Sequence, residues 1–153
     1  MSSVIIYKNC PKNFVPQVSI SAGWLCHGNE FLFLQRTAQS SEAFCWGVPA
    51  GKIELNETPD AALAREVFEE TGIALSSDRI QYMDILYIFK PGWKYIYHMF
   101  FYQFKSKPAV KISKEHHDHI WISLTTVTDY PLMQGITETL SIFESKAKKL
   151  GLI

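Results

Sequence analysis

The segment Gly51–Ile73 constrains the fold of this chain more than any other part of the sequence, because its second half carries both ends of a helix. Thr58 is a suitable N-cap, and Pro59 suits the first helical position, where a missing N–H costs nothing. Gly72 can end a helix in the left-handed conformation. The sequence therefore predicts a helix over Thr58–Thr71.

The predicted helix carries three glutamates on one face. Glu66, Glu69 and Glu70 stand at i, i+3 and i+4, which are neighbouring positions on a helical surface, so their like charges repel one another. A divalent cation would relieve this repulsion, and Mg²⁺ in particular takes oxygen ligands and leaves room for substrate phosphates. The other side of the helix, which we expect to contact the core, consists of Leu63, Ala64, Val67 and Phe68.

A glutamate-rich helix face is usually only solvated, so these three residues alone leave a plain surface and a metal site both open. The full spacing is more specific: Gly, five residues, Glu, seven residues, Arg-Glu, an aliphatic, any residue, Glu-Glu, any residue, Gly, an aliphatic. Seven fixed matches arise by chance roughly a few times in 10⁹. The residues on this pattern are Gly51, Glu57, Arg65, Glu66, Val67, Glu69, Glu70, Gly72 and Ile73.

This pattern resembles the box of the Nudix hydrolases. The resemblance implies an α-β-α sandwich and the hydrolysis of a nucleoside diphosphate linked to another group, with the help of Mg²⁺ or Mn²⁺. It also implies a set of metal ligands, namely Glu66, Glu69, Glu70 and the backbone carbonyl of Ala50. We name the segment Gly51–Ile73 the box.

Two further roles follow from the same resemblance. Arg65 could form only a surface ion pair with Glu57, which would contribute little if exposed. The family pattern favours the other interpretation, in which Arg65 orients a box glutamate and tethers the loop. For the general base, Glu69 is the first choice inside the box, and Glu115, matched by its place in the fold, is the candidate outside it.

Three histidines follow Glu115, at positions 116, 117 and 119. A zinc site is the weaker interpretation, because no cysteines stand at zinc spacing. We expect instead a polar loop that rims the site, and a titratable histidine that assists catalysis stays open.

The candidates for substrate contact are Arg36, Phe44 and Trp46. Many relatives have a phosphate-binding arginine where Arg36 stands, although an ordinary charge at a strand end is equally compatible. Phe44 and Trp46 could stack on a base. Other aromatic residues, which we expect in the core, are Tyr95, Tyr97 and Phe101.

The subfamily stays open. Many relatives have Pro-Gly-Gly where this chain has Pro49-Ala50-Gly51, and Lys90-Pro91 stand near the position of a tyrosine expected in dinucleoside polyphosphate hydrolases. A MutT-like nucleoside triphosphate pyrophosphohydrolase is slightly favoured, because no N-terminal dimerisation extension of the ADP-sugar hydrolases is present. The alternatives are an ADP-sugar or dinucleotide pyrophosphatase, and a catalytically silent nucleotide-binding module.

Apolar periodicity and turn residues predict the remaining elements, and their order is that of a mixed α/β fold. An exposed loop is expected over Thr37–Ala43, a short extended segment over Cys45–Ala50, and an amphipathic helix over Leu132–Leu150. The predicted strands are Val15–Leu25, Phe31–Gln35, Gln81–Phe89, Lys94–Lys105 and Ile120–Leu124.

Length and composition fit one domain over residues 1–153, either monomeric or homodimeric. Fifteen basic and fifteen acidic residues cancel, which gives no electrostatic reason for polymeric nucleic acid or an anionic membrane as partner. No apolar run approaches the roughly 20 residues of a membrane span, and the N-terminus does not resemble a signal peptide. Three cysteines without CxxC spacing fit a reduced, cytoplasmic protein.

Overall fold

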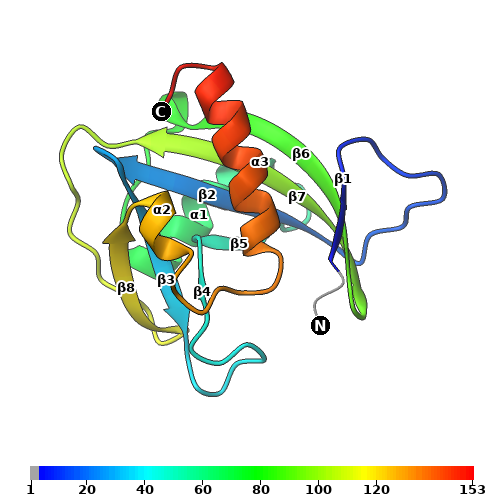
Figure 1. The fold of residues 1–153 in the computed structure, drawn as a ribbon, viewed down its shortest axis with the longest axis horizontal. Coiled ribbons are helices and arrows are strands. Elements are labelled where there is room, and N and C mark those ends of the chain that lie inside the picture. Colours follow the sequence, from blue (N-terminus) through cyan, green and yellow to red (C-terminus); the bar gives the residue numbers. More distant parts are fainter. Residues whose placement is uncertain (1–3) are drawn as a thin grey trace.

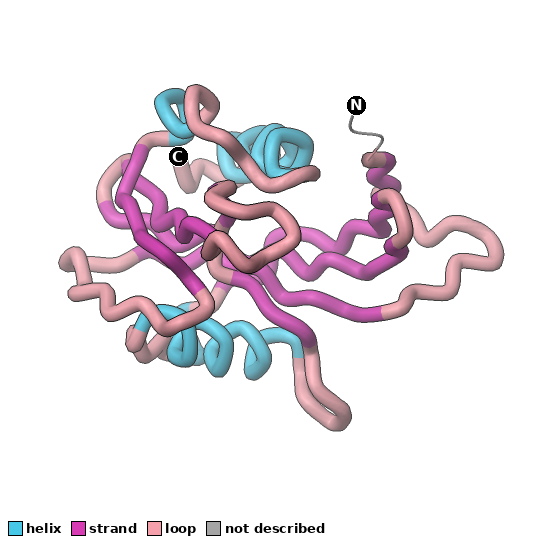
Figure 2. The backbone as a smooth tube through the Cα atoms, turned by 90° about the horizontal axis from the view of Figure 1, so that it is seen from below, coloured by secondary structure: helices cyan, strands magenta, loops and turns pink. Residues whose placement is uncertain are grey.

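The computed structural model describes residues 4–153, and these form a mixed eight-stranded sheet with helices on both faces (Figures 1 and 2). Residues 1–3, which belong to the expected domain and to the N-terminal segment considered above, lie outside the described residues. The strands are β1 Ile5–Tyr7, β2 Val18–His27, β3 Glu30–Arg36, β4 Trp46–Gly47, β5 Ala50–Lys52, β6 Gln81–Lys90, β7 Trp93–Gln103 and β8 His116–Ile122. The helices are α1 Pro59–Thr71, the 3₁₀ turn η1 Ser77–Arg79, α2 Leu124–Val127 and α3 Ile136–Lys149.

The central strand β2 changes partners along its length. On one side it runs parallel to β7 from Val18 to Cys26. On the other side its first half pairs with β5, and only its last two residues pair with β3. After the turn, β3 leaves β2 and pairs with β4 and β8 instead. The sheet is therefore split between β3 and β5, the strands that carry Arg36 and Ala50 of the site described below.

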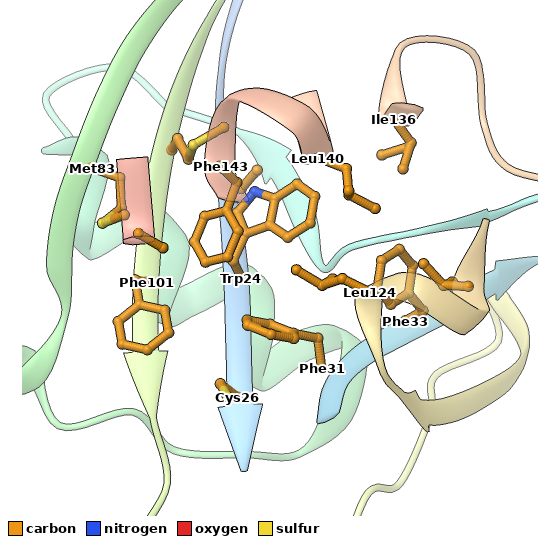
Figure 3. Close-up of a cluster of buried hydrophobic side chains, with 14 of the residues drawn as sticks. Trp24, Cys26, Phe31, Phe33, Met83, Phe101, Leu124, Ile136, Leu140 and Phe143 are labelled. Carbon is orange, nitrogen blue, oxygen red and sulfur yellow. The ribbon is translucent and has the colours of Figure 1, made fainter. Parts of the chain in front are cut away.

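Alternation along β2 divides the core into two layers. Trp24 faces α3 and stacks on Phe143, with ring centroids 4.7 Å apart and an interplanar angle of 9° (Figure 3). Leu25 faces the opposite way and packs in a cluster with Leu63 and Val67 of α1. Each face of the sheet is thus covered by a helix, which confirms the predicted α-β-α sandwich with a mixed sheet.

The box helix α1 has the expected ends. Thr58 caps it by accepting a hydrogen bond from the N–H of Ala61, and Gly72 ends it at φ 73°. One prediction for its core face is wrong, because Phe68 is 58% exposed. At about 100° per residue, Phe68 lies some 140° around the helix from Leu63. The position on the core stripe, seven residues after Leu63, belongs to Glu70, which is only 5% exposed.

Two other predictions need correction, and two short elements were not predicted. The helix expected from Leu132 begins at Ile136, because Gly135, at φ 96°, interrupts the pattern. The histidines expected in a loop lie in β8, which begins at His116. The short elements β1 and α2 carry too few residues for a periodic signal. None of the helices described over residues 4–153 is both long and apolar enough to span a membrane.

The contact between Trp24 and Phe143 yields a stability prediction. Phe143→Ala leaves a cavity under α3, and we expect it to lower the free energy of unfolding by about 3–5 kcal/mol. Urea denaturation measures this loss. Ser145→Ala, an exposed position on the same helix, is the matched control and should leave the midpoint unchanged. Equal midpoints for the two variants would contradict the packing described here.

Candidate active site

The loop that enters the box passes directly over α1. The N–H of Ala50 donates a hydrogen bond to Glu70 Oε1 at 3.2 Å, which fastens β5 to the helix. At the next residue, a Cβ on Gly51 would lie 1.9 Å from the carboxyl carbon of Glu66. Only glycine therefore leaves room for the Glu66 side chain at this crossing.

Arg65 connects the entrance loop to the glutamates. Its Nε and Nη2 donate to the two carboxylate oxygens of Glu57 at 2.8 and 2.9 Å, and its Nη1 donates to Glu66 at 2.8 Å. Its Nη2 also donates to the carbonyl of Lys52 at 2.9 Å. The hydrogen bonds from Arg65 lower the pKa of Glu57 to about 2. Arg65 therefore forms the ion pair with Glu57 and contacts the box glutamate Glu66 at the same time.

The box carboxylates differ in burial. The side chain of Glu69 is 56% exposed and that of Glu66 is 15% exposed, whereas Glu70 is almost fully buried. Burial, followed by the negative charge of Glu66, raises the pKa of Glu70 well above its ordinary value. Burial also raises the pKa of Glu66. Glu115 contributes to both increases, so this residue from the other side of the sheet split lies within electrostatic reach of the box.

These oxygen donors fit a hard divalent cation. Several carboxylates share one cavity, and the buried Glu70 has a backbone N–H but no cationic side chain as partner. Across residues 4–153, however, no group of three or more His, Cys, Asp or Glu side chains is preassembled to hold a metal ion. The physical reason is that Arg65 holds Glu66, while Ala50 holds Glu70.

Two cavities meet at this site. The first, of about 740 Å³, contains Glu66, Glu69, Glu70 and Glu115, and we name it the carboxylate cavity. The second, of about 610 Å³, is lined by aromatic residues of β7, and we name it the aromatic cavity. The residues that line both are Arg36, Val48, Ala50, Lys52 and Met133, which we name the junction.

The substrate candidates are distributed unevenly. Arg36 lies in the junction. Trp46 is only 7% exposed and packs edge-on against Tyr130, and Phe44 packs edge-on against His117. Neither of these two rings lines either cavity. The structure therefore does not bring Phe44 and Trp46 together with the box.

The rings that do line the aromatic cavity are Trp93, Tyr95 and Tyr97. Tyr97 also belongs to the core, as expected, and its hydroxyl accepts a hydrogen bond from Trp24 Nε1 at 3.2 Å. Phe101 is a buried core residue, as expected. Tyr95 and Tyr97 are two residues apart in β7, so their side chains lie on the same face of the sheet. This alternation in the sequence could have indicated that the two rings line one cavity together.

Sequence reasoning missed Glu42 as well. Its carboxylate accepts a hydrogen bond from the N–H of Gln134 at 2.6 Å and pairs with Lys90 at 3.3 Å. Glu42 thereby ties the loop expected to be exposed, Thr37–Ala43, to the β6–β7 hairpin and to the segment before α3. All three residues line the aromatic cavity, so this contact shapes its rim.

Comparison with known proteins decides the family. The model of the NUDIX domain matches residues 16–140 of the chain. The chain belongs to the Nudix family. This is the family that the spacing of the box predicts.

Individual relatives agree with this assignment. An 8-oxo-dGTP diphosphatase of Proteus vulgaris is 46% identical over 59 residues, which cover 37% of this chain and 52% of that protein. The chain spans about half or less of the length of the curated relatives it matches. The crystal structure of the MutT protein from Methanosarcina mazei Go1 is similar to this structure, with a TM-score of 0.73 and 26% sequence identity. The similarity covers 87% of this chain and 96% of that protein.

A second structure extends the likeness of fold. The bifunctional NMN adenylyltransferase/ADP ribose pyrophosphatase of Francisella tularensis, complexed with AMP and a manganese ion, has a TM-score of 0.72 at 22% identity. The similarity covers 87% of this chain and 42% of that protein. At this identity the comparison shows a shared fold.

The contacts of Arg65 predict the effect of its removal. Arg65→Ala releases Glu66 and the entrance loop, and we expect hydrolysis to fall by about 10- to 100-fold while the fold stays intact. Steady-state rates and urea midpoints measure the two effects. Arg79→Ala, at a residue that lines neither the carboxylate cavity nor the aromatic cavity, is the control and should retain activity. An Arg65→Ala enzyme with unchanged rates would refute a positioning role.

The close approach at Gly51 predicts a second effect. Gly51→Ala forces the Glu66 side chain aside, and we expect a loss of activity of about 10-fold or more with little change in the urea midpoint. The control is the same substitution in a Glu66→Ala background, where no side chain is left to collide with the new methyl group. If Gly51→Ala causes an equal further loss there, the collision with Glu66 is not its cause.

Proposed function

We propose that this Nudix hydrolase depends on Mg²⁺ or Mn²⁺ and cleaves the pyrophosphate linkage of a nucleoside di- or triphosphate derivative. A MutT-like nucleoside triphosphate pyrophosphohydrolase, which releases pyrophosphate and a nucleoside monophosphate, is the favoured form. The observation that supports this proposal is the junction, whose residues line both a cavity rich in carboxylates and a cavity lined by aromatic rings.

The two cavities match the two halves of a nucleotide. Aromatic rings offer flat apolar faces on which a base can stack. In the aromatic cavity, Trp93 is exposed to solvent and Tyr95 is half-buried, so both rings are accessible to a ligand. The carboxylates of the other cavity would repel a phosphate chain unless cations lay between them. A base in the aromatic cavity would therefore direct its phosphates through the junction toward Glu66, Glu69 and Glu70.

In this proposal the ligands of the cation are Glu66, Glu69, Glu70 and the carbonyl of Ala50. When bound, the cation would screen the phosphates and lower the pKa of a coordinated water. The chain's own residues provide position: Arg65 holds Glu66, and the N–H of Ala50 holds Glu70 against the entrance loop. Arg36 places a positive charge on the path of the phosphates.

We rank the two candidates for the general base, Glu69 and Glu115, in the same order as in the sequence analysis. Glu69 is the first choice because its carboxylate is the most exposed of the three glutamates on α1 that line the cavity, and it makes only a long contact, 3.5 Å, with Arg65. Glu115 is the second choice, since it lines the same cavity. A carboxylate that is not held by strong hydrogen bonds is free to accept a proton from water.

A panel of nucleotides tests the proposal. The purified chain is incubated with Mg²⁺ or Mn²⁺ and with nucleoside triphosphates, ADP-sugars and dinucleoside polyphosphates, and the products are separated by ion-exchange chromatography. We expect a monophosphate and pyrophosphate from a triphosphate, and no turnover in the presence of EDTA. Glu69→Gln and Glu70→Gln should each abolish hydrolysis, whereas Glu144→Gln, on α3, should not.

Other results would redirect the assignment. Preferred cleavage of an ADP-sugar or a dinucleotide would replace the MutT-like form with the corresponding pyrophosphatase. Tight binding of one nucleotide without hydrolysis of any would indicate a silent nucleotide-binding module. Full activity of Glu69→Gln and Glu70→Gln would show that the metal site is misplaced.

A further inference from the structure

In the part of the chain that the structure describes, two side chains of the carboxylate cavity each have a buried nitrogen without a hydrogen-bond partner. Among residues 4–153, the buried side-chain nitrogen or oxygen atoms without a hydrogen-bond partner are Arg36 Nε and His116 Nδ1. No ion pair of the Arg36 guanidinium is found among the described residues either, although several carboxylates line the same cavity. Because a buried polar group without a partner is costly, a pair of them in one cavity indicates a ligand.

The sheet places these two residues together. Arg36, near the end of β3, is the register partner of His116 at the start of β8, next to a bulge between Gln35 and Arg36. Directly opposed residues of antiparallel strands project to the same face of a sheet. Both side chains line the carboxylate cavity, on the wall formed by β3 and β8 rather than by α1.

This wall offers nitrogen donors together with the carboxylate of Glu115, which directly precedes β8, whereas the wall formed by α1 offers only carboxylates. The complement of an arginine and a histidine without acceptors is an anion, and phosphate oxygens accept hydrogen bonds from both. No protein hydrogen bond holds the His116 ring among the described residues, so a rotation that turns a ring nitrogen toward the cavity breaks none. The α1 wall and the β3–β8 wall could thus hold one phosphate chain between them.

The positions of the two residues differ along the path of the substrate. Arg36 belongs to the junction and reaches both cavities, whereas His116 lines the carboxylate cavity alone. A nucleoside in the aromatic cavity would bring its first phosphates to Arg36. Only a phosphate farther along the chain would reach His116.

We propose that His116, beside Arg36, binds the terminal phosphate of the substrate and makes the enzyme selective for triphosphates over diphosphates. This inference rests on the proposed function, because it assumes that the nucleoside occupies the aromatic cavity. His116 is a specificity residue here, and the proposal gives it no part in proton transfer.

The test compares a nucleoside triphosphate with the diphosphate of the same nucleoside. His116→Phe keeps a ring of similar size but removes both nitrogens. We expect it to lower kcat/KM for the triphosphate by about 10-fold or more, mainly through KM, and to change kcat/KM for the diphosphate by less than about twofold. His116→Asn retains an N–H donor near the position of Nδ1 and should restore most of the loss.

The matched control is His119→Phe, which makes the same change in the same strand at a residue that does not line the cavity. It should leave both values of kcat/KM unchanged. An equal loss for triphosphate and diphosphate in His116→Phe would assign the residue a structural role and overturn the proposal. Unchanged kinetics in that variant would also overturn it.

A binding measurement separates this inference from the proposed function. Inorganic tripolyphosphate and pyrophosphate are titrated with Mg²⁺ into the unsubstituted ¹⁵N-histidine-labelled chain, and the His116 signal is assigned by its loss in His116→Phe. We expect the ring nitrogens of His116 to shift with tripolyphosphate and much less with pyrophosphate. That result without hydrolysis of any nucleotide would reject the proposed function and retain the phosphate site. Hydrolysis of a triphosphate without such a shift would reject the phosphate site and retain the proposed function.

Discussion

The site depends on the attachment of the entrance loop to the box helix through buried Glu70. This carboxylate occupies the core stripe of α1, in line with Leu63 and Val67, and accepts the N–H of Ala50 from the loop. Burial of a carboxylate is costly unless hydrogen bonds or cations compensate it. One hydrogen bond from the backbone satisfies only part of that demand, so the fold leaves a carboxylate with a strong affinity for positive charge beside a cavity.

Arg65 answers a different requirement. The repulsion among the box glutamates would spread them apart, but Arg65 contacts Glu57, Glu66 and the carbonyl of Lys52 at once. The rigid fork of a guanidinium suits such a bridge better than the single ammonium of lysine. Arg65 therefore connects the entrance loop to the helix, and the absence of a side chain at Gly51 leaves room for Glu66 where the two cross.

The sequence predicts the local structure of the box well because all of its signals are local. Thr58 and Gly72 mark the ends of the helix through their own hydrogen bonds and backbone angles, whatever the rest of the chain does. Phe68 is the exception in the box: it is apolar, but its angular position on the helix directs it to solvent. An apolar residue type alone therefore does not predict that a helical residue is buried. The family and the sandwich also follow from this short segment.

The substrate cavity could be predicted only in part, because it is assembled from distant segments. Glu42 gains its role from Lys90 and the N–H of Gln134, and the sequence contains no local signal for either contact. Trp46 and Phe44 stand next to the box in sequence, but packing against Tyr130 and His117 turns them elsewhere. Proximity along the chain is a poor guide where loops from three parts of the fold converge.

The parallel pairing of β2 with β7 has a consequence for how the molecule forms. β2 lies near the start of the chain, but its register partners from Tyr95 to Gln103 follow only after the box helix and β6. Closing so large a loop is entropically slow, and folds rich in such distant pairings form late and cooperatively. On a ribosome, the acidic helix would therefore emerge before β7, and the sheet that orients this helix could close only after β7 had been synthesised.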